Sequence, residues 1–222
     1  MPERKALLRF VFHVGAIFLV LAVATAVAGI FVRIWSPPFD VAAMKAVADH
    51  RTSVSTAVAG IVSDAGSFAI LAPLTIALLL LRQWKRPADD LALIVVAAGT
   101  AALPSVVKLI VARPRPTIEH LTHLTSLSFP SEHATQAAGI YLAIASLLTQ
   151  GRPETWRRLA LGLALLLALL VALSRVLLGV HYPTDVIAGL LLGWAWTIGI
   201  FRYARSQLKA PGQPEIVQPA PK

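Results

Sequence analysis

Six long apolar stretches dominate this chain of 222 residues, and short polar segments separate them. An α-helix rises about 1.5 Å per residue and the hydrocarbon core of a bilayer is about 30 Å thick, so such stretches are typical of membrane-spanning helices. Helices are expected because backbone groups in lipid must be hydrogen-bonded within their own segment. We therefore expect an all-α bundle of six transmembrane helices, the shorter ones extended by flanking residues. The stretches are residues 10–32, 66–81, 91–111, 134–148, 159–173 and 186–201.

The composition agrees with a membrane protein. Hydrophobic residues make up 57% of the chain and charged residues 14%, whereas a soluble domain has roughly 45–50% and 25%. The chain has no cysteine, which excludes disulfides, thiolate metal sites and a cysteine nucleophile.

The formal net charge is +9, and its distribution reflects membrane topology. Four basic clusters lie at alternate ends of the apolar stretches, as the positive-inside rule expects of cytoplasmic segments. They are Arg4, Lys5 and Arg9; Arg82, Lys85 and Arg86; Arg152, Arg157 and Arg158; and Arg202, Arg205 and Lys209. We therefore expect both termini in the cytoplasm of a bacterium, with the chain in its inner membrane. No basic stripe is interleaved with exposed aromatic residues, so nucleic-acid binding is not expected.

The first apolar stretch has two interpretations. Its basic residues, apolar run and small residues near Ala26 resemble a cleavable signal peptide. The run of about twenty residues has the length of a membrane anchor, so we favour an uncleaved helix.

The other peripheral segments are less hydrophobic. Residues 33–63 are expected to include an interfacial helix. One face of that helix is expected to hold Val41, Met44, Val47 and Ala48. We expect residues 1–205 to form one domain. Residues 206–222 contain four prolines without apolar periodicity, which is typical of a disordered tail.

Three short polar segments interrupt the apolar pattern between residues 108 and 185. They are Lys108 to Pro116, Pro130 to His133, and Ser174 to Asp185. With the N-terminus in the cytoplasm, all three emerge on the extracytoplasmic face, although they lie up to 77 residues apart in sequence. Ionisable residues are costly beside a bilayer, so such a cluster indicates a functional site.

The cations of these segments suit an anion such as phosphate. Arg115 and Arg175 have planar guanidinium groups that can bind phosphate through two hydrogen bonds each, and Lys108 adds a compact charge. Arg113 is expected instead to snorkel or to contact a lipid headgroup. Ser131 directly precedes an apolar helix and is expected to be its N-cap, with backbone N–H groups directed toward the anion.

Two histidines and a carboxylate complete the set. Pro183 is a natural first residue of the last helix, which places Asp185 in the first turn. Asp185 can then accept the Nδ1 proton of His181 and leave Nε2 free to attack phosphorus. His133 has a pKa range suited to general acid–base catalysis. No acidic cluster with metal-ligand spacing is present, so we expect no metal and no cofactor.

The three segments share their spacing with a known family. Lys108 is followed after six residues by Arg115-Pro116; Pro130-Ser131-x-His133 comes next; Ser174-Arg175 is then followed after five residues by His181 and after three more by Asp185. This pattern resembles the three-part signature of the type 2 phosphatidic acid phosphatase family, whose superfamily also includes vanadium-dependent haloperoxidases. The resemblance implies that His181 is the nucleophile and forms a phosphohistidine. It also implies that His133 protonates the leaving oxygen and then activates water, without a metal.

One residue departs from the family pattern. Glu132 lies between Ser131 and His133, where the family usually has glycine, and glycine lets the backbone approach phosphate closely. A glutamate in the first turn is favourable to the helix dipole, and its side chain is expected to point outward. Bacterial undecaprenyl-diphosphate phosphatases resemble this chain in having an acidic residue here. We therefore include Glu132 among the phosphate-site positions.

The sequence thus predicts an integral membrane lipid phosphatase, with undecaprenyl diphosphate as the preferred substrate. Phosphatidate, phosphatidylglycerophosphate and lipid A 1-phosphate are alternatives. A protein of another class, which binds or transports lipid phosphates with little catalysis because of Glu132, is the second interpretation. A haloperoxidase is disfavoured because those relatives are larger and lack six membrane spans. His120 and His123 are candidates for lining the entrance, and the oligomeric state is left open.

Overall fold

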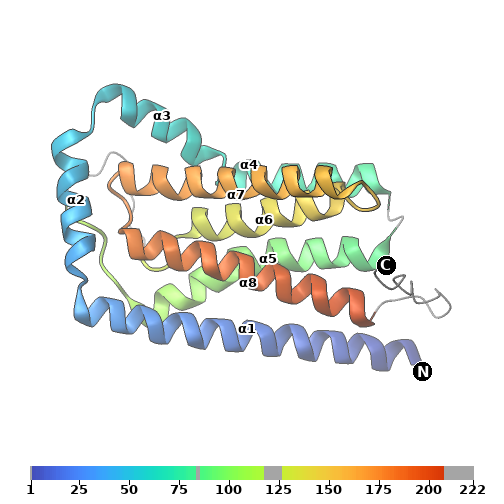
Figure 1. Cartoon of the computed structure of the whole chain (residues 1–222). Helices are drawn as coiled ribbons and strands as arrows, with labels where there is room; N and C mark the ends of the chain where they lie inside the picture. The colour runs from blue at the N-terminus through green and yellow to red at the C-terminus, as the bar shows by residue number, and fades with distance from the viewer. Residues whose placement is uncertain (1, 84–85, 118–126, 208–222) are drawn as a thin grey trace, which may run out of the picture.

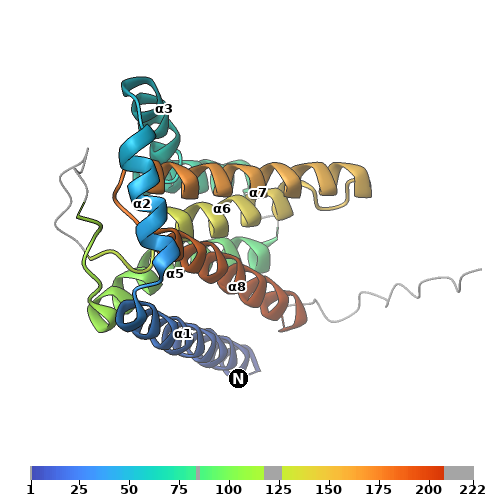
Figure 2. The same ribbon diagram turned by 60° about the vertical axis from the view of Figure 1, so that its left-hand side comes forward.

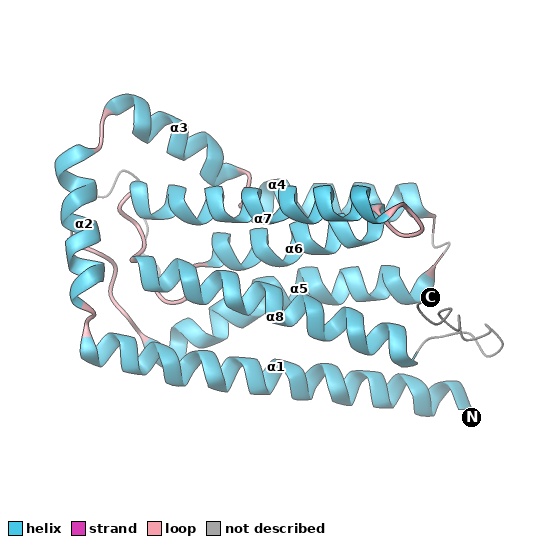
Figure 3. Cartoon of the chain, viewed as in Figure 1, coloured by secondary structure: helices cyan, strands magenta, loops and turns pink. Residues whose placement is uncertain are grey.

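The computed structural model describes residues 2–83, 86–117 and 127–207, and in these ranges the regular secondary structure is helical (Figure 1). Eight helices and no strand occur in this part of the chain (Figure 3). Their bounds are α1 Pro2–Trp35, α2 Pro38–His50, α3 Ser53–Asp64, α4 Phe68–Arg82, α5 Pro87–Val111, α6 Glu132–Leu148, α7 Glu154–Leu177 and α8 Pro183–Gln207. The all-α expectation is therefore confirmed. Most of the expected C-terminal tail, residues 208–222, lies outside the described residues.

Five helical segments of the described chain are long and apolar enough to cross a membrane. They are Leu8–Trp35, Ser53–Arg82, Pro87–Val111, Glu154–Leu177 and Pro183–Ser206. Each contains one of the six apolar stretches, and the chain is an integral membrane protein. The remaining stretch forms α6, which has 17 residues and is therefore about 26 Å long. A count of six membrane spans stays a prediction.

Helix α6 lies at the centre of the bundle and packs against α4, α5, α7 and α8. Its buried positions are mostly small, which lets neighbouring backbones approach closely. Those positions include Ala134, Ala137, Ala138, Gly139, Ala143 and Ala145. The closest approach is to α8, where a Cβ added to Gly193 would lie 2.3 Å from the carbonyl oxygen of Thr135. The contact between α6 and α8 determines how the first turns of these two helices meet.

The apolar core and the apolar surface have different locations. Large side chains such as Trp196, Leu93 and Leu103 are buried between α5, α6 and α8. Leu81 and Leu109, by contrast, are 79% and 80% exposed. An outer surface of large apolar side chains is the arrangement expected of a bundle surrounded by lipid tails. The N-terminal end of α1 and the C-terminal end of α8 lie at the same end of the bundle (Figure 1).

At the opposite end, α2 crosses the ends of α7 and α8 (Figure 1, Figure 2). A helix is therefore present where one was expected, and its location at the membrane interface stays a prediction. Met44 is buried and Val47 packs against the core, whereas Val41 is 60% exposed and Ala48 is exposed. The side of α2 that faces the bundle also includes the buried carboxylate of Asp40, which an apolar pattern cannot indicate.

Candidate active site

The structure brings the three polar segments together at the end of the bundle that α2 crosses. Four helices and two connecting segments supply the predicted residues. Lys108 is in the last turn of α5, Arg115 follows that helix, Ser131, Glu132 and His133 begin α6, Arg175 is in the last turn of α7, His181 lies between α7 and α8, and Asp185 is in the first turn of α8.

Local sequence explains why each element starts or stops here. Ala112 takes a left-handed conformation (φ 49°) and ends α5, and the prolines that follow cannot continue a helix. Ser131 is the N-cap of α6, as expected, and its Oγ accepts a long hydrogen bond of 3.5 Å from Ala134 N. Pro183 is the first residue of α8, also as expected. The connection before it turns at Gly179, whose φ of 76° favours glycine.

The three motif cations lie close enough to one another to interact electrostatically. Arg115 Nη1 donates to Val180 O at 2.5 Å and lies 3.3 Å from His181 Nε2. Arg175 is 5% exposed, donates to Ser63 Oγ at 2.5 Å, and leaves its Nε without a hydrogen bond. Like charges grouped in a buried site repel one another, so an anion would bind strongly among these cations.

The ring of His181 is buried and oriented by its neighbours. Because arginine can only donate, His181 Nε2 accepts from Arg115, and the proton of the neutral ring lies on Nδ1. Nδ1 faces Asp185 Oδ2 at 3.5 Å without forming a hydrogen bond, and it has no other hydrogen-bond partner. Burial lowers the pKa of His181 to about 4; Asp185 opposes this shift, while Arg115 and Arg175 add to it. The ring is therefore neutral at pH 7.

Asp185 is held by more groups than its expected partner. Its Oδ2 accepts hydrogen bonds from Ser128 Oγ and, at 2.9 Å, from the backbone N–H of Tyr182. Its backbone carbonyl accepts from Ser131 N at 3.0 Å, which joins the first turns of α6 and α8. Ser128 was not predicted from the sequence, because nothing in its spacing distinguishes it from other loop serines.

His133 is partly exposed in the first turn of α6. It lies close enough to Arg175, His181 and Lys108 to interact electrostatically with each of them. It therefore faces the same group of cations as His181. This position agrees with an acid–base partner, and its role stays a prediction.

The side chain of Glu132 was expected to point away from the site, but it does not. Its Oε1 lies 3.0 Å from Lys108 Nζ, while the carboxylate side chain remains 37% exposed. A buried ammonium without a counter-charge is unfavourable, and the carboxylate of Glu132 supplies one. Glu132 thus supplies an internal anion to one of the three motif cations.

Arg113 is not a snorkelling residue, and this expectation was wrong. It is 4% exposed; its Nη1 donates to Asp185 Oδ1 at 2.6 Å and its Nη2 to Asp40 Oδ2 at 2.8 Å. Its guanidinium also lies over the ring of Tyr182, 4.1 Å from the ring centre. The partners are 72 and 73 residues away in sequence. The only sequence feature that indicated a buried ion pair was Asp40, a carboxylate in the otherwise apolar start of α2.

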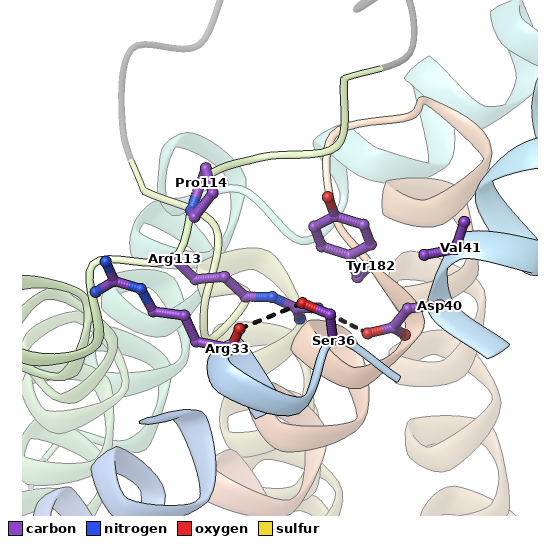
Figure 4. Close-up of a pocket in the computed structure, with 7 residues that line it drawn as sticks. All are labelled: Arg33, Ser36, Asp40, Val41, Arg113, Pro114 and Tyr182. Carbon is purple, nitrogen blue, oxygen red and sulfur yellow. Dashed lines mark hydrogen bonds and ion pairs between the residues drawn. The ribbon is translucent and has the colours of Figure 1, made fainter. Parts of the chain in front are cut away.

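A cavity of about 100 Å³ lies beside this network (Figure 4). Its lining comes from α1, α2 and the segments around the site, namely Arg33, Ser36, Asp40, Val41, Arg113, Pro114 and Tyr182. Arg33 is exposed there and donates to Val111 O at 2.6 Å.

Two sequence predictions concern what lies around the site. His120 and His123 lie outside the described residues. Among the residues that are described, no three His, Asp or Glu side chains are grouped as metal ligands. The metal-independent reaction stays a prediction.

Comparisons with known proteins identify a family whose model covers the three polar segments. The model of the PAP2 superfamily matches residues 90–209, more than half of the chain and all three polar segments. Phosphatidylglycerophosphatase B of Bacillus subtilis is 37% identical over 112 residues, which are 50% of this chain and 55% of that protein. Undecaprenyl-diphosphatase BcrC of the same organism is 33% identical over 110 residues, 47% of this chain and 51% of the relative. The matched part thus spans about half the length of these curated relatives.

A solved structure is similar over most of the fold. It is the transmembrane PAP2 type phosphatidylglycerolphosphate phosphatase from Bacillus subtilis, with a TM-score of 0.74 and 28% identity. The alignment covers 90% of this chain and 97% of that one.

Proposed function

This chain belongs to the PAP2 superfamily, and we propose that it is a membrane lipid phosphatase that hydrolyses phosphate mono- or diphosphate esters. The observation that carries the proposal is the placement of Arg115 against His181 Nε2 within a buried, cation-rich site. The relatives named above are phosphatases of phosphatidylglycerophosphate and undecaprenyl diphosphate, which supports a lipid substrate. Undecaprenyl diphosphate is our preferred substrate; phosphatidylglycerophosphate, phosphatidate and lipid A 1-phosphate are alternatives.

The first chemical step is attack by His181 on phosphorus. The lone pair of Nε2 forms the P–N bond while the bond between phosphorus and the leaving oxygen breaks. His133, which takes up a proton when the negatively charged substrate binds beside it, gives that proton to the leaving oxygen. Arg115 lies 3.3 Å from the attacking nitrogen, so it is in position to bind an oxygen of the transferred phosphoryl group. The lowered pKa of His181 keeps the attacking nitrogen unprotonated at pH 7.

Water completes the reaction in a second step. His133, now neutral, takes a proton from water as the oxygen attacks phosphorus, and the P–N bond breaks to release inorganic phosphate. Arg115, Arg175 and the backbone N–H groups at the start of α6 stabilise charge on the phosphoryl oxygens, and Lys108 adds to this once Glu132 has moved away. The chemistry requires no metal.

The basic clusters support a topology in which both termini are cytoplasmic and the site opens on the extracytoplasmic face of a bacterial inner membrane. A lipid phosphate in the outer leaflet would then reach the site laterally, with its tail in the bilayer.

The proposed function is tested by phosphate release from a panel of lipids in detergent with EDTA present. The panel contains undecaprenyl diphosphate, phosphatidylglycerophosphate and phosphatidate. We expect hydrolysis by the wild type and none by His181→Ala. The matched control is His50→Ala, because His50 is an exposed histidine whose ring bonds only the carbonyl of Ala46. Turnover by His181→Ala at the wild-type rate would remove the assignment of the nucleophile.

A second candidate function rests on the ion pair between Glu132 and Lys108. A carboxylate that competes for one of three phosphate-binding cations favours a protein that binds or transports lipid phosphates and hydrolyses them weakly. Binding of these lipids without hydrolysis by the wild type, together with hydrolysis by Glu132→Gly, would establish this alternative. Equal or lower turnover by Glu132→Gly excludes it.

A further inference from the structure

The buried ion pairs beside His181 carry a role that phosphate binding does not explain. We propose that Arg113, held in place by Asp40, is a positioning residue that fixes the carboxylate of Asp185 and, through it, the ring of His181. This inference rests on the proposed function, because it assigns both residues to the same reaction.

Arg113 joins two buried carboxylates. Asp40, Arg113 and Asp185 are 1%, 4% and 0% exposed. The two terminal nitrogens of one planar guanidinium contact the two carboxylates at 2.8 and 2.6 Å. Because the guanidinium is rigid and planar, it fixes the direction of each carboxylate as well as its distance.

Asp40 also binds the helix that carries Asp185. Its Oδ1 accepts from Thr184 N at 3.1 Å, and its Oδ2 accepts from Thr184 Oγ1 at 2.5 Å. The backbone N–H of Thr184 lies in the first turn of α8, where such groups have no partner within the helix. A carboxylate at this position is also favoured by the helix dipole. Asp40 of α2 therefore caps α8 from outside and holds Arg113 against the same turn.

These contacts leave the Asp185 carboxylate no freedom to rotate. Arg113 donates to Oδ1, while Ser128 and the Tyr182 N–H donate to Oδ2. The remaining approach of Oδ2 to His181 Nδ1, at 3.5 Å, is set by this arrangement. A shift of roughly 0.5 Å would convert that approach into a hydrogen bond. The position of Arg113 thus determines whether Asp185 can hold the Nδ1 proton while Nε2 attacks.

The test uses steady-state phosphate release from the best lipid of the panel, combined with calorimetric titration of inorganic phosphate. Loss of such a supporting contact typically costs 10- to 100-fold in activity. We expect kcat to fall about 10-fold in Arg113→Lys and Asp40→Asn, and about 100-fold in Arg113→Gln. The affinity and stoichiometry of phosphate binding should not change, because Lys108, Arg115 and Arg175 are untouched. A merely structural role would instead lower kcat and the stoichiometry together.

The matched control is Arg33→Gln. Arg33 lines the same cavity as Arg113 (Figure 4) but donates to the carbonyl of Val111 and not to Asp185. Its kcat should equal that of the wild type. If Arg113→Gln does not fold, Arg113→Lys and Asp40→Asn decide the question. Unchanged kcat in these two variants, or kcat and stoichiometry falling in parallel, overturns the inference.

A second measurement separates this inference from the proposed function. If the wild type releases no phosphate from any lipid, the function fails, and ¹⁵N-histidine spectra then judge the positioning claim alone. The resonances of His181 are identified by their loss in His181→Ala. We expect the population with the proton on Nδ1 to fall in Asp40→Asn and to remain in Arg33→Gln. Identical spectra of His181 in the wild type and in Asp40→Asn would overturn the claim.

Discussion

Replacing Gly193 with alanine is expected to destabilise the protein, although alanine is the better helix former. Gly193 lies on α8 where this helix meets α6. An added Cβ would lie 2.3 Å from the carbonyl oxygen of Thr135 and 3.0 Å from the backbone nitrogen of Gly139. These neighbours are backbone atoms that cannot rotate away. The two helices must therefore separate by roughly 1 Å to reach ordinary contact.

The magnitude follows from two opposing effects. Overpacking of a well-packed interface costs about 1–3 kcal/mol, and the gain in helix propensity offsets at most about 1 kcal/mol of that. We expect a net loss of about 1–2 kcal/mol in the free energy of unfolding. Gly162 on α7 is the matched control, because a Cβ there meets no atom within 4 Å. Gly162→Ala should be neutral or stabilising by up to about 1 kcal/mol.

The assay is unfolding in detergent, followed by circular dichroism, together with phosphate release. Activity should fall in Gly193→Ala because Ser131 N bonds the carbonyl of Asp185, and this contact joins α6 to α8 at the site. Gly189 lies one turn closer to the site on the same face, and a Cβ added there would lie 2.6 Å from Ser131 O. The reasoning is refuted if Gly193→Ala is as stable and as active as Gly162→Ala.

Three further predictions concern pH, topology and the internal anion. Because the pKa of His181 is about 4 in the folded protein and 6.5 as the usual value, the neutral ring contributes stability that is present above pH 6.5 and lost as the pH falls through 4. Between pH 7 and 3.5, the free energy of unfolding of His181→Gln should therefore fall by roughly 3 kcal/mol less than that of the wild type, as measured by unfolding at each pH. Equal decreases would contradict the lowered pKa. With cysteines at positions 120 and 154 of this cysteine-free chain, an impermeant thiol reagent should label 120 and not 154 in intact cells, and the reverse pattern would invert the topology. Glu132→Gln should lower the Ki of inorganic phosphate about 3- to 10-fold, because it removes a carboxylate that competes for Lys108. An unchanged Ki would show that the ion pair between Glu132 and Lys108 does not compete with phosphate.

The spacing of the motif residues was sufficient to predict which segments would meet. Lys108, Arg175 and Asp185 each lie at the end of an apolar stretch, so helix length and topology place them at one end of the bundle. Ser131 and Pro183 mark helix starts by their own backbone chemistry, which is local and therefore readable. These features required no knowledge of how the helices pack.

What the sequence could not show depends on contacts between distant residues. Arg113 has the same local pattern as Arg115, and only the positions of Asp40 and Asp185 distinguish a buried clamp from a lipid-facing arginine. Glu132 pairs with Lys108 across two helices, whereas the helix dipole alone permits either rotamer. The side of α2 that faces the bundle includes a buried carboxylate, which an apolar pattern cannot indicate.

The ion pair between Lys108 and Glu132 also has a kinetic consequence. A carboxylate that must leave the ammonium before any phosphate binds weakens the binding of substrate and the binding of product to the same extent. Such a uniform loss raises KM and leaves the barrier from the bound complex unchanged. Release of inorganic phosphate becomes faster, because Glu132 returns to Lys108 as the product departs. Where release limits turnover, an enzyme that carries its own competing anion cycles faster at high substrate and resists inhibition by the phosphate it produces.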